Sequence, residues 1–271
     1  MPISVKTCTG IEEAARTLAG SRSARLFGGG TLVMRALNEG TQEFDTLVRV
    51  SDPALRQVKP EGDRITIGAA VTMAEVMANR DLGFLAPVAR TIGGPAVRSA
   101  ATVGGNLFAA SPYGDVTVAL LALDGMVTLA GAARPVSLED FLKVRDREPR
   151  TVVAAVTILR PRDAQAFRFR KVSRVKPKGI SVMSIAAYLP LSGGRITGAR
   201  VAYGAMGPTP LRAKAVERAL EGRSLDAAGI AAALAAATEG LDPPTDALAS
   251  SWYRREVAPV HLRRVLLDEA P

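Results

Sequence analysis

Two glycine clusters, far apart in the chain, have the residue types that suit binding of a phosphate group. The sequence TVGGN at 102–106 contains Gly104 and Gly105, and FGGGT at 27–31 contains three consecutive glycines. Glycine allows a ligand to approach the backbone closely and leaves N–H groups free for an anion such as a pyrophosphate. One such cluster alone is also typical of an ordinary surface turn, but the presence of two favours a shared ligand.

Asp115 is an isolated acid that follows the second cluster. It ends the segment ASPYGD at 110–115 and precedes the apolar run VTVALLAL at 116–123. A carboxylate in this place is suited to accept hydrogen bonds from ribose hydroxyls, as acidic residues do in many dinucleotide sites. The alternative interpretation is an aspartate that caps the following helix.

The first cluster lies between a predicted strand and a predicted helix. Residues 25–27 form a short apolar strand, and 32–39 have a helical periodicity that ends at Gly40. A strand, a glycine turn and a helix N-terminus together favour binding of an anion. The consecutive glycines match neither the GxGxxG fingerprint nor the lysine-containing P-loop.

The rest of the pattern predicts three units that would position these residues. The first has a strand at 3–7, a helix that begins near residue 10 and a closing strand at 44–50. The second has strands at 64–69, 126–129 and 151–159, a helix capped by Thr72 and Glu75, a helix at 83–91 and a short helix within 136–142. The third has strands at 167–172, 180–189 and 196–203, then helices at 213–221, 227–239 and about 251–267.

The composition argues against several classes of protein. With 271 residues, of which 48% are hydrophobic and 23% charged, the chain is typical of a globular protein. The net charge of +9 is dispersed and aromatic residues are only 4%, so no nucleic-acid partner is indicated. A basic surface equally suits an anionic cofactor or an acidic partner protein.

Cysteine and histidine are too scarce for several kinds of site. Cys8 and His261 are the only residues of their types, which excludes an internal disulfide, a metal cluster held by this chain and a histidine-based triad. We therefore expect no metal site and no catalytic side chain. No signal peptide is recognised, and the apolar run at 180–191 is short and contains Pro190, so we expect a cytoplasmic protein without a membrane span.

Taken together and in order, the motifs identify a family resemblance. GGGT, TVGGN, ASPYGD and GAMGPTPLRA at 204–213 extend over nearly the whole length. The chain resembles the FAD-binding medium subunit of molybdenum hydroxylases, the family of carbon monoxide dehydrogenase and xanthine dehydrogenase flavoproteins. The resemblance implies an α+β fold: a two-part FAD-binding domain of the vanillyl-alcohol-oxidase or PCMH type, then a C-terminal α+β domain with a three-stranded sheet and helices. The corresponding domains would be 1–55, 56–162 and 163–271.

The resemblance also implies which residues bind FAD. Both glycine clusters would surround the pyrophosphate, and Asp115 would contact the adenosine side. Ile92, Val153 and Lys171 would lie against the cofactor, toward the flavin. The complete expected set is Leu26, Phe27, Gly28, Gly29, Gly30, Thr31, Leu32, Ile92, Thr102, Val103, Gly104, Gly105, Asn106, Ser111, Asp115, Val153 and Lys171.

Two segments depart from the family pattern. Relatives usually have AGGTDL at the first cluster, so Gly30 here is either an inserted glycine or a shift in register. After Lys171 the chain has RVKPKGISVMS, which is closer to the ALAIS branch of the family but has Pro177 and Lys178 as unusual residues. The extra iron–sulfur cluster of some relatives is not expected, because Cys8 is the only cysteine.

The implied function is electron transfer. A small partner subunit with two [2Fe–2S] clusters would deliver electrons to FAD on this chain, from substrate oxidised at the molybdenum cofactor of a large subunit. The acceptor would be NAD⁺, a quinone, oxygen or a carrier protein, and the complex a heterotrimer or a dimer of heterotrimers. Two alternatives stay open: a stand-alone FAD-dependent oxidase, and a non-catalytic nucleotide-binding assembly protein.

Overall fold

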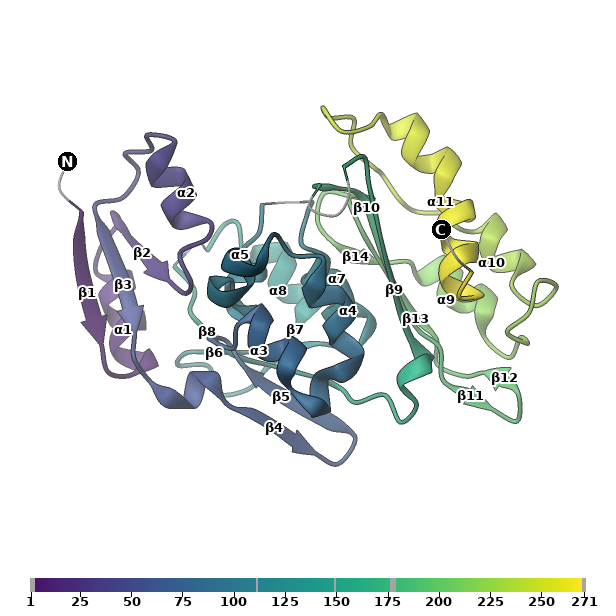
Figure 1. The fold of residues 1–271 in the computed structure, drawn as a ribbon, viewed down its shortest axis with the longest axis horizontal. Helices are drawn as coiled ribbons and strands as arrows, with labels where there is room; N and C mark the ends of the chain where they lie inside the picture. Colours follow the sequence, from purple (N-terminus) through teal and green to yellow (C-terminus); the bar gives the residue numbers. More distant parts are fainter. Residues whose placement is uncertain (1–2, 111, 149, 176–178, 270–271) are drawn as a thin grey trace.

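The first unit is a small parallel sheet. The computed structural model describes residues 3–110, 112–148, 150–175 and 179–269, arranged as three units side by side (Figure 1). The first sheet has the strand order β1-β3-β2, with β1 (Ser4–Cys8), β2 (Ala24–Phe27) and β3 (Thr46–Val50). The connections contain α1 (Ile11–Ala19) and α2 (Val33–Asn38). The helix α1 forms because Ala14 and Leu18 recur at helical spacing and pack on Val48 and Cys8.

The middle unit is built on a five-stranded antiparallel sheet in the order β4-β5-β8-β6-β7. Its strands are β4 (Val58–Glu61), β5 (Arg64–Gly68), β6 (Met126–Leu129), β7 (Val136–Ser137) and β8 (Val153–Leu159). Ile65 and Ile67 face the core, whereas Thr66 forms a 2.9 Å hydrogen bond with Thr157 across the strands. This alternation is typical of an antiparallel sheet with one buried face.

Short helices cover the buried face of this sheet (Figure 1). They are α3 (Met73–Ala78), α4 (Ala86–Arg90), α5 (Pro95–Ala100), α6 (Val103–Asn106), α7 (Asp115–Ala122) and α8 (Leu138–Val144), with 3₁₀ turns at Pro53–Arg56, Arg80–Leu85 and Ala164–Ala166. The predicted capping box is confirmed, because Thr72 accepts from the Glu75 N–H and Glu75 from the Thr72 N–H. The single helix expected at 83–91 is instead a 3₁₀ turn followed by α4, which begins where Pro87 fits its first turn.

The helix α7 is the most completely buried element of the middle unit, since all eight of its residues are buried. It packs on α4 on one side and on the C-terminal sheet on the other, where it contacts β10 and β13. A helix that is apolar all round is one that is covered on all sides. The apolar run after Asp115 therefore joins the two larger units.

The C-terminal sheet has four strands in the order β14-β13-β10-β9. Two of the expected strands are β9 (Phe167–Ser173) and β10 (Ser181–Tyr188). The strand expected at 196–203 is shorter, because a turn at Gly198, with a φ of 67°, interrupts it and only β13 (Arg200–Gly204) joins this sheet. The two-residue strand β14 (Leu211–Arg212) adds a fourth at the edge. The short hairpin β11 (Leu191–Ser192) and β12 (Arg195–Ile196) forms a separate two-stranded sheet. Side chains of β10 alternate: Ala186 faces α7, and Ile185 and Ala187 face the C-terminal helices.

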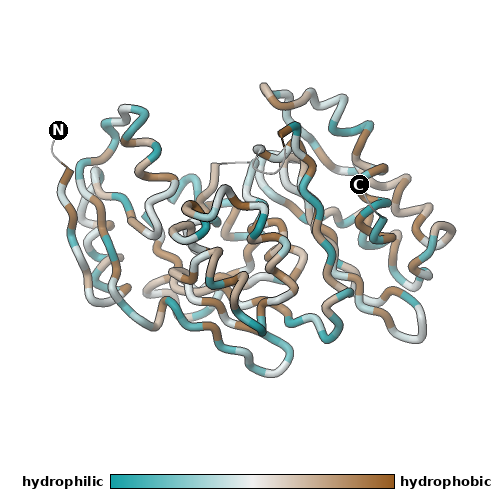
Figure 2. Tube along the Cα trace, viewed as in Figure 1, coloured by the Kyte–Doolittle hydropathy of each residue, from teal (hydrophilic) through white to brown (hydrophobic). Residues whose placement is uncertain are grey.

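The C-terminal helices cover the outer face of that sheet (Figure 1). They are α9 (Lys214–Leu220), α10 (Ala231–Ala235) and α11 (Ser251–Leu266). The helix predicted at 227–239 is wrong in length, because Asp226 accepts the Gly229 N–H in a turn and Gly229 lies tightly against Ser224. Apolar residues lie mostly between the layers, whereas the turn between β4 and β5 is hydrophilic (Figure 2).

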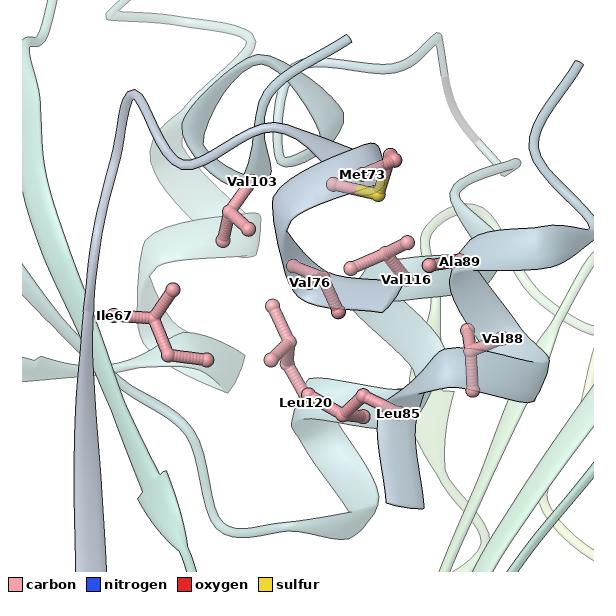
Figure 3. Close-up of a pocket in the computed structure, with 9 residues that line it drawn as sticks. All are labelled: Ile67, Met73, Val76, Leu85, Val88, Ala89, Val103, Val116 and Leu120. Atoms are coloured by element: carbon pink, nitrogen blue, oxygen red, sulfur yellow. The ribbon is translucent and has the colours of Figure 1, made fainter. Parts of the chain in front are cut away.

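A small cavity lies in the core of the middle unit, between α3, α4, α7 and β5 (Figure 3). Its volume is about 10 Å³, at the lower limit for one water molecule, and its walls are apolar. The lining side chains are Ile67, Met73, Val76, Leu85, Val88, Ala89, Val103, Val116 and Leu120. This cavity is a packing feature of the core and too small for a cofactor.

Candidate functional site

The two glycine loops predicted from the sequence lie against each other. The first follows β2, and the second begins α6 after α5, so β2 points toward α5 (Figure 1). A Cβ added at Gly29 would overlap the carbonyl oxygen of Ala100, and one added at Gly28 would lie 3.1 Å from Thr102 Oγ1. Only glycine allows this approach of two backbones. The fold thus brings together the residues predicted to share a ligand.

The first glycine loop, residues 28–32, presents unused backbone donors. Within the described part of the chain, the backbone N–H groups of Gly29, Gly30 and Thr31 donate no hydrogen bond to another backbone group. Gly30 has a φ of 75°, a conformation that favours glycine, and the Phe27 ring packs on it. The carbonyl of Gly30 accepts the Met34 N–H at 2.8 Å, which fixes the turn to α2. Successive free N–H groups of this kind bind anions.

The second glycine loop, residues 102–106, is organised differently, and the expectation of free N–H groups there is wrong. The Gly104 N–H donates to the carbonyl of Ala69 at 2.8 Å, and the Gly105 N–H donates to Thr102 Oγ1 at 3.0 Å. A Cβ added at Gly104 would lie 2.8 Å from the Ala69 Cβ. Gly104 therefore serves close packing on the segment that follows β5, whereas a Cβ added at Gly105 would lie 2.9 Å from Thr102 Oγ1 in the same loop. One polar atom does stay unpaired: Asn106 Oδ1 is buried without a hydrogen-bond partner among the described residues.

A buried ion pair forms the third part of the site. Lys171 Nζ on β9 lies 2.8 Å from Asp115 Oδ2 at the start of α7, and both side chains are nearly buried. Ser181 Oγ on β10 donates to Asp115 Oδ1 at 2.6 Å. Lys171 also donates to the carbonyl of Thr91, next to Ile92, at 3.3 Å. Asp115 is therefore engaged by protein donors on both oxygens, although a carboxylate has about four acceptor positions.

The other predicted residues lie at the edges of this arrangement. Ile92 is half-buried, and Arg98 donates to the carbonyl of Gly93 beside it at 2.7 Å. Val153 is buried in β8, which packs on α6. Leu26 is half-buried beside α1, whereas Leu32 is 49% exposed. Ser111, like Pro177 and Lys178, lies outside the described residues.

The residues of the site fit a dinucleotide. The first glycine loop offers N–H donors without acceptors, as a pyrophosphate requires. Asn106 Oδ1 offers an unpaired acceptor, and Lys171 offers a cation whose position is fixed by Asp115. The backbone N–H groups of Gly29, Gly30 and Thr31 would hold the pyrophosphate of FAD. Lys171 would lie against the cofactor, toward the flavin.

Sequence reasoning missed several residues that hold the site. Tyr113 donates to Asp246 Oδ2 at 2.7 Å, and Arg254 is paired with the same carboxylate at 2.9 Å. Burial acts to raise the pKa of Asp246, but hydrogen bonds from Tyr113, Arg254 and two backbone N–H groups outweigh it and lower the pKa to about 2. Burial, followed by the Asp246 hydrogen bond, raises the pKa of Tyr113. Ser181, Asp246 and Arg254 have no local sequence signal, since each is recognised only through its distant partner.

Two negative findings apply to the part of the chain that the structure describes. No three histidine, cysteine, aspartate or glutamate side chains in it come together as a metal site would require. None of its helices combines the length and the apolar character needed to cross a membrane.

Comparison with known proteins gives the family. A family model described as the FAD binding domain in molybdopterin dehydrogenase matches residues 2–161, and one described as the CO dehydrogenase flavoprotein C-terminal domain matches residues 168–268. The chain is 28% identical to the glyceraldehyde dehydrogenase medium chain of Sulfolobus acidocaldarius, over 92% of each chain. It is 27% identical to the carbon monoxide dehydrogenase medium chain of Afipia carboxidovorans, over 97% of this chain and 91% of that one.

Solved structures agree with this assignment. Quinoline 2-oxidoreductase from Pseudomonas putida 86 superposes with a TM-score of 0.88 at 26% identity, over 99% of this chain and 97% of that chain. Carbon monoxide dehydrogenase from Hydrogenophaga pseudoflava shares the fold, with a TM-score of 0.89 at 24% identity over 98% and 96% of the two chains. The chain therefore belongs to the family of FAD-binding medium subunits of molybdenum hydroxylases and is an oxidoreductase subunit.

Proposed function

We propose that this chain is the electron-transfer subunit of a molybdenum-containing hydroxylase or dehydrogenase. In this role it takes electrons from [2Fe–2S] clusters of a partner subunit and passes them to an external acceptor. When bound, FAD supplies the redox chemistry, and the protein supplies binding, orientation and charge. No side chain of this chain acts as nucleophile or general base in the proposal.

The observation that carries the proposal is the contact between the two glycine loops. Gly29 touches Ala100 so closely that no side chain fits between them. The N–H groups of Gly29, Gly30 and Thr31 donate no hydrogen bond to the backbone of the described residues. Three consecutive donors without a protein acceptor are explained by an anionic ligand, and the pyrophosphate of FAD is such a ligand.

The remaining residues have separate roles in the proposal. Asp115 fixes the ammonium group of Lys171, which donates a hydrogen bond to the cofactor. Ile92 and Val153 give apolar contacts, and Asn106 Oδ1 accepts a hydrogen bond from the cofactor. Leu26, Phe27, Gly28, Leu32, Thr102, Val103 and Ser111 complete the proposed site.

The proposed partners are a large subunit with the molybdenum cofactor and a small subunit with two [2Fe–2S] clusters. Relatives support this, since two are named medium chains and another is named a subunit of a 6-hydroxypseudooxynicotine dehydrogenase complex. We propose a heterotrimer or a dimer of heterotrimers. The clusters, the substrate and the acceptor would belong to other molecules.

The first experiment is co-expression of the chain with its genomic neighbours, followed by purification, a visible spectrum and flavin extraction. The proposal predicts non-covalent FAD, one per chain, with molybdenum and iron–sulfur signals from co-purifying chains. FAD on a chain that turns over substrate without partners would favour the stand-alone oxidase. A complex that stays colourless after incubation with FAD would contradict the proposal and favour the non-catalytic assembly protein.

A variant pair tests the loop contact itself. Gly29→Ala places a methyl group on the Ala100 carbonyl, whereas Gly83→Ala places one where no atom lies within 4 Å. We expect Gly29→Ala to weaken FAD binding strongly and Gly83→Ala to bind FAD as the wild type does. Equal binding by both variants would contradict the role given to the first loop.

A further inference from the structure

The loop from Pro112 to Asp115, between α6 and α7, is held by residues of the C-terminal unit. The Ala205 N–H donates to the carbonyl of Pro112 at 3.1 Å. Tyr113 donates to Asp246 Oδ2 at 2.7 Å. Asp115 accepts a hydrogen bond from Ser181 Oγ and forms an ion pair with Lys171. Nearly every residue of this loop therefore has a partner from another unit.

Arg254 connects these contacts. Its side chain is fully buried on α11, and its Nη2 donates to both oxygens of Asp246 at 2.9 Å. Its Nε donates to the carbonyl of Val182 at 2.9 Å, next to Ser181. One guanidinium group thus fixes both the acceptor of Tyr113 and the strand that carries Ser181. A rigid fork of donors is the property that distinguishes arginine in such a role.

Ala205 adds a sign of constraint at the same place. Its φ of 61° is unusual for a residue with a side chain, and it is fully buried. Such a conformation persists only where the surrounding structure determines it. Here it directs the N–H of Ala205 at the carbonyl of Pro112.

We propose that the C-terminal unit sets the positions of Asp115 and Lys171 in the FAD site, with Tyr113, Ser181 and Asp246 as positioning residues. The proposal rests on the FAD site proposed above. It gives the C-terminal unit a role in cofactor binding that no glycine motif reveals. Without these contacts, the loop at 112–115 would no longer be held at a constant distance from β9. The carboxylate of Asp115 would then no longer hold the ammonium group of Lys171 in place.

Two matched pairs of variants test it in the full-length chain, freed of flavin and titrated with FAD. Tyr113→Phe removes the hydroxyl that binds Asp246, and Tyr203→Phe removes a buried hydroxyl without a partner among the described residues. Ser181→Ala removes the donor to Asp115, and Ser184→Ala removes a hydroxyl from the same strand that has no such partner. The dissociation constant, the number of FAD bound at saturation and the midpoint potential of bound FAD are measured for each.

We expect Tyr113→Phe and Ser181→Ala each to raise the dissociation constant about tenfold, since both lose a hydrogen bond to a charged group. The double variant should raise the dissociation constant by less than the product of the two single increases, because both residues act on one loop. The midpoint potential should shift in these variants, which partial unfolding alone would not cause. Tyr203→Phe and Ser184→Ala should match the wild type in all three measurements.

Two results would overturn the proposal. One is a dissociation constant within about twofold of the matched control for both test variants. The other is an unchanged constant and potential with fewer FAD bound at saturation, which would indicate a purely structural role. A wild-type chain that binds no FAD would instead refute the proposed function, so the two failures are distinguishable.

Discussion

The two glycine loops of this protein use the same residue type for different ends. In the loop at 28–32, the N–H groups of Gly29, Gly30 and Thr31 donate no hydrogen bond to the backbone of the described chain. In the loop at 102–106, the N–H groups of Gly104 and Gly105 are bonded to Ala69 and Thr102. The first loop is suited to bind a ligand, and the second is suited to build the surface on which the first one rests.

A glycine motif can therefore indicate either ligand binding or close backbone packing. In the TVGGN segment, Gly104 is explained by packing against the segment after β5, and Gly105 by its contact with Thr102. The GGGT segment, in contrast, holds the backbone N–H groups that donate no backbone hydrogen bond. Substitutions in the first loop should therefore weaken cofactor binding, whereas those in the second should act mainly on folding.

The largest expected effect is that of Gly29→Ala on FAD affinity. Because its methyl group would overlap the carbonyl of Ala100, the loop would move and several N–H donors would lose their alignment. We expect the affinity to fall about 100-fold, as loss of one or two charge-assisted hydrogen bonds predicts. The free energy of unfolding, measured by urea denaturation without FAD, should also fall, by about 2 kcal/mol or more, because the methyl group meets backbone atoms. A loss of stability without a loss of affinity would reverse the comparison.

Gly104→Ala should lower stability with a smaller effect on FAD affinity. Its Cβ would lie 2.8 Å from the Ala69 Cβ and 2.9 Å from the Ala69 carbonyl oxygen. Overpacking of this kind should lower the free energy of unfolding by about 2 kcal/mol. Gly83→Ala, an exposed position with free space, is the control for the denaturation curves. Equal stability of the two variants would show that the second loop tolerates side chains.

Acid should lower the free energy of unfolding, because it protonates Asp246, the partner of Tyr113 in the loop that follows the second cluster. The pKa of Asp246 is about 2 in the folded protein, below its ordinary value of 3.8, so its charge stabilises the fold above about pH 4. That contribution, about 2 kcal/mol, should disappear as the pH falls through 2. Measured from pH 7 to pH 2, the difference in unfolding free energy between wild type and Asp246→Asn should shrink. A constant difference would mean that Asp246 is not charged in the fold.

The smallest expected effects are those of substitutions at Thr102 and Thr31, one threonine in each glycine loop. Thr102→Val removes the oxygen that accepts the Gly105 N–H and should cost about 1 kcal/mol of unfolding free energy. Thr31→Val should cost no stability, because within the described chain the Thr31 hydroxyl has no hydrogen-bond partner. Thermal unfolding of both variants without FAD checks this. Equal losses would remove the distinction between the loops.

Local sequence signals predicted much of the fold. The strand before the first glycine loop, the capping box at Thr72 and Glu75, and the long strands β9 and β10 follow from periodicity and capping chemistry. The errors occur where tertiary contacts override propensity. The Ala-rich segment after residue 227 forms only a short α10, and α5, β4 and β14 were not predicted.

The site was predictable only in part. Glycine clusters and Asp115 are visible in the sequence, but hydrogen-bond satisfaction is not. The pairing of Asp115 with Lys171 and Ser181 depends on how two units pack. The same is true of Tyr113 with Asp246, whose residues lie 133 positions apart. Long-range polar partners have no periodicity that a sequence pattern can report.

The proposed difference between the two glycine loops is tested most simply by backbone amide hydrogen exchange. Exchange is followed by mass spectrometry on the full-length chain, without and with saturating FAD. We expect amides at 28–32 to exchange rapidly without FAD and to become strongly protected with it, whereas amides at 103–106 should be protected in both states. Protection of residues 28–32 without FAD, or no change on adding FAD, would contradict this expectation.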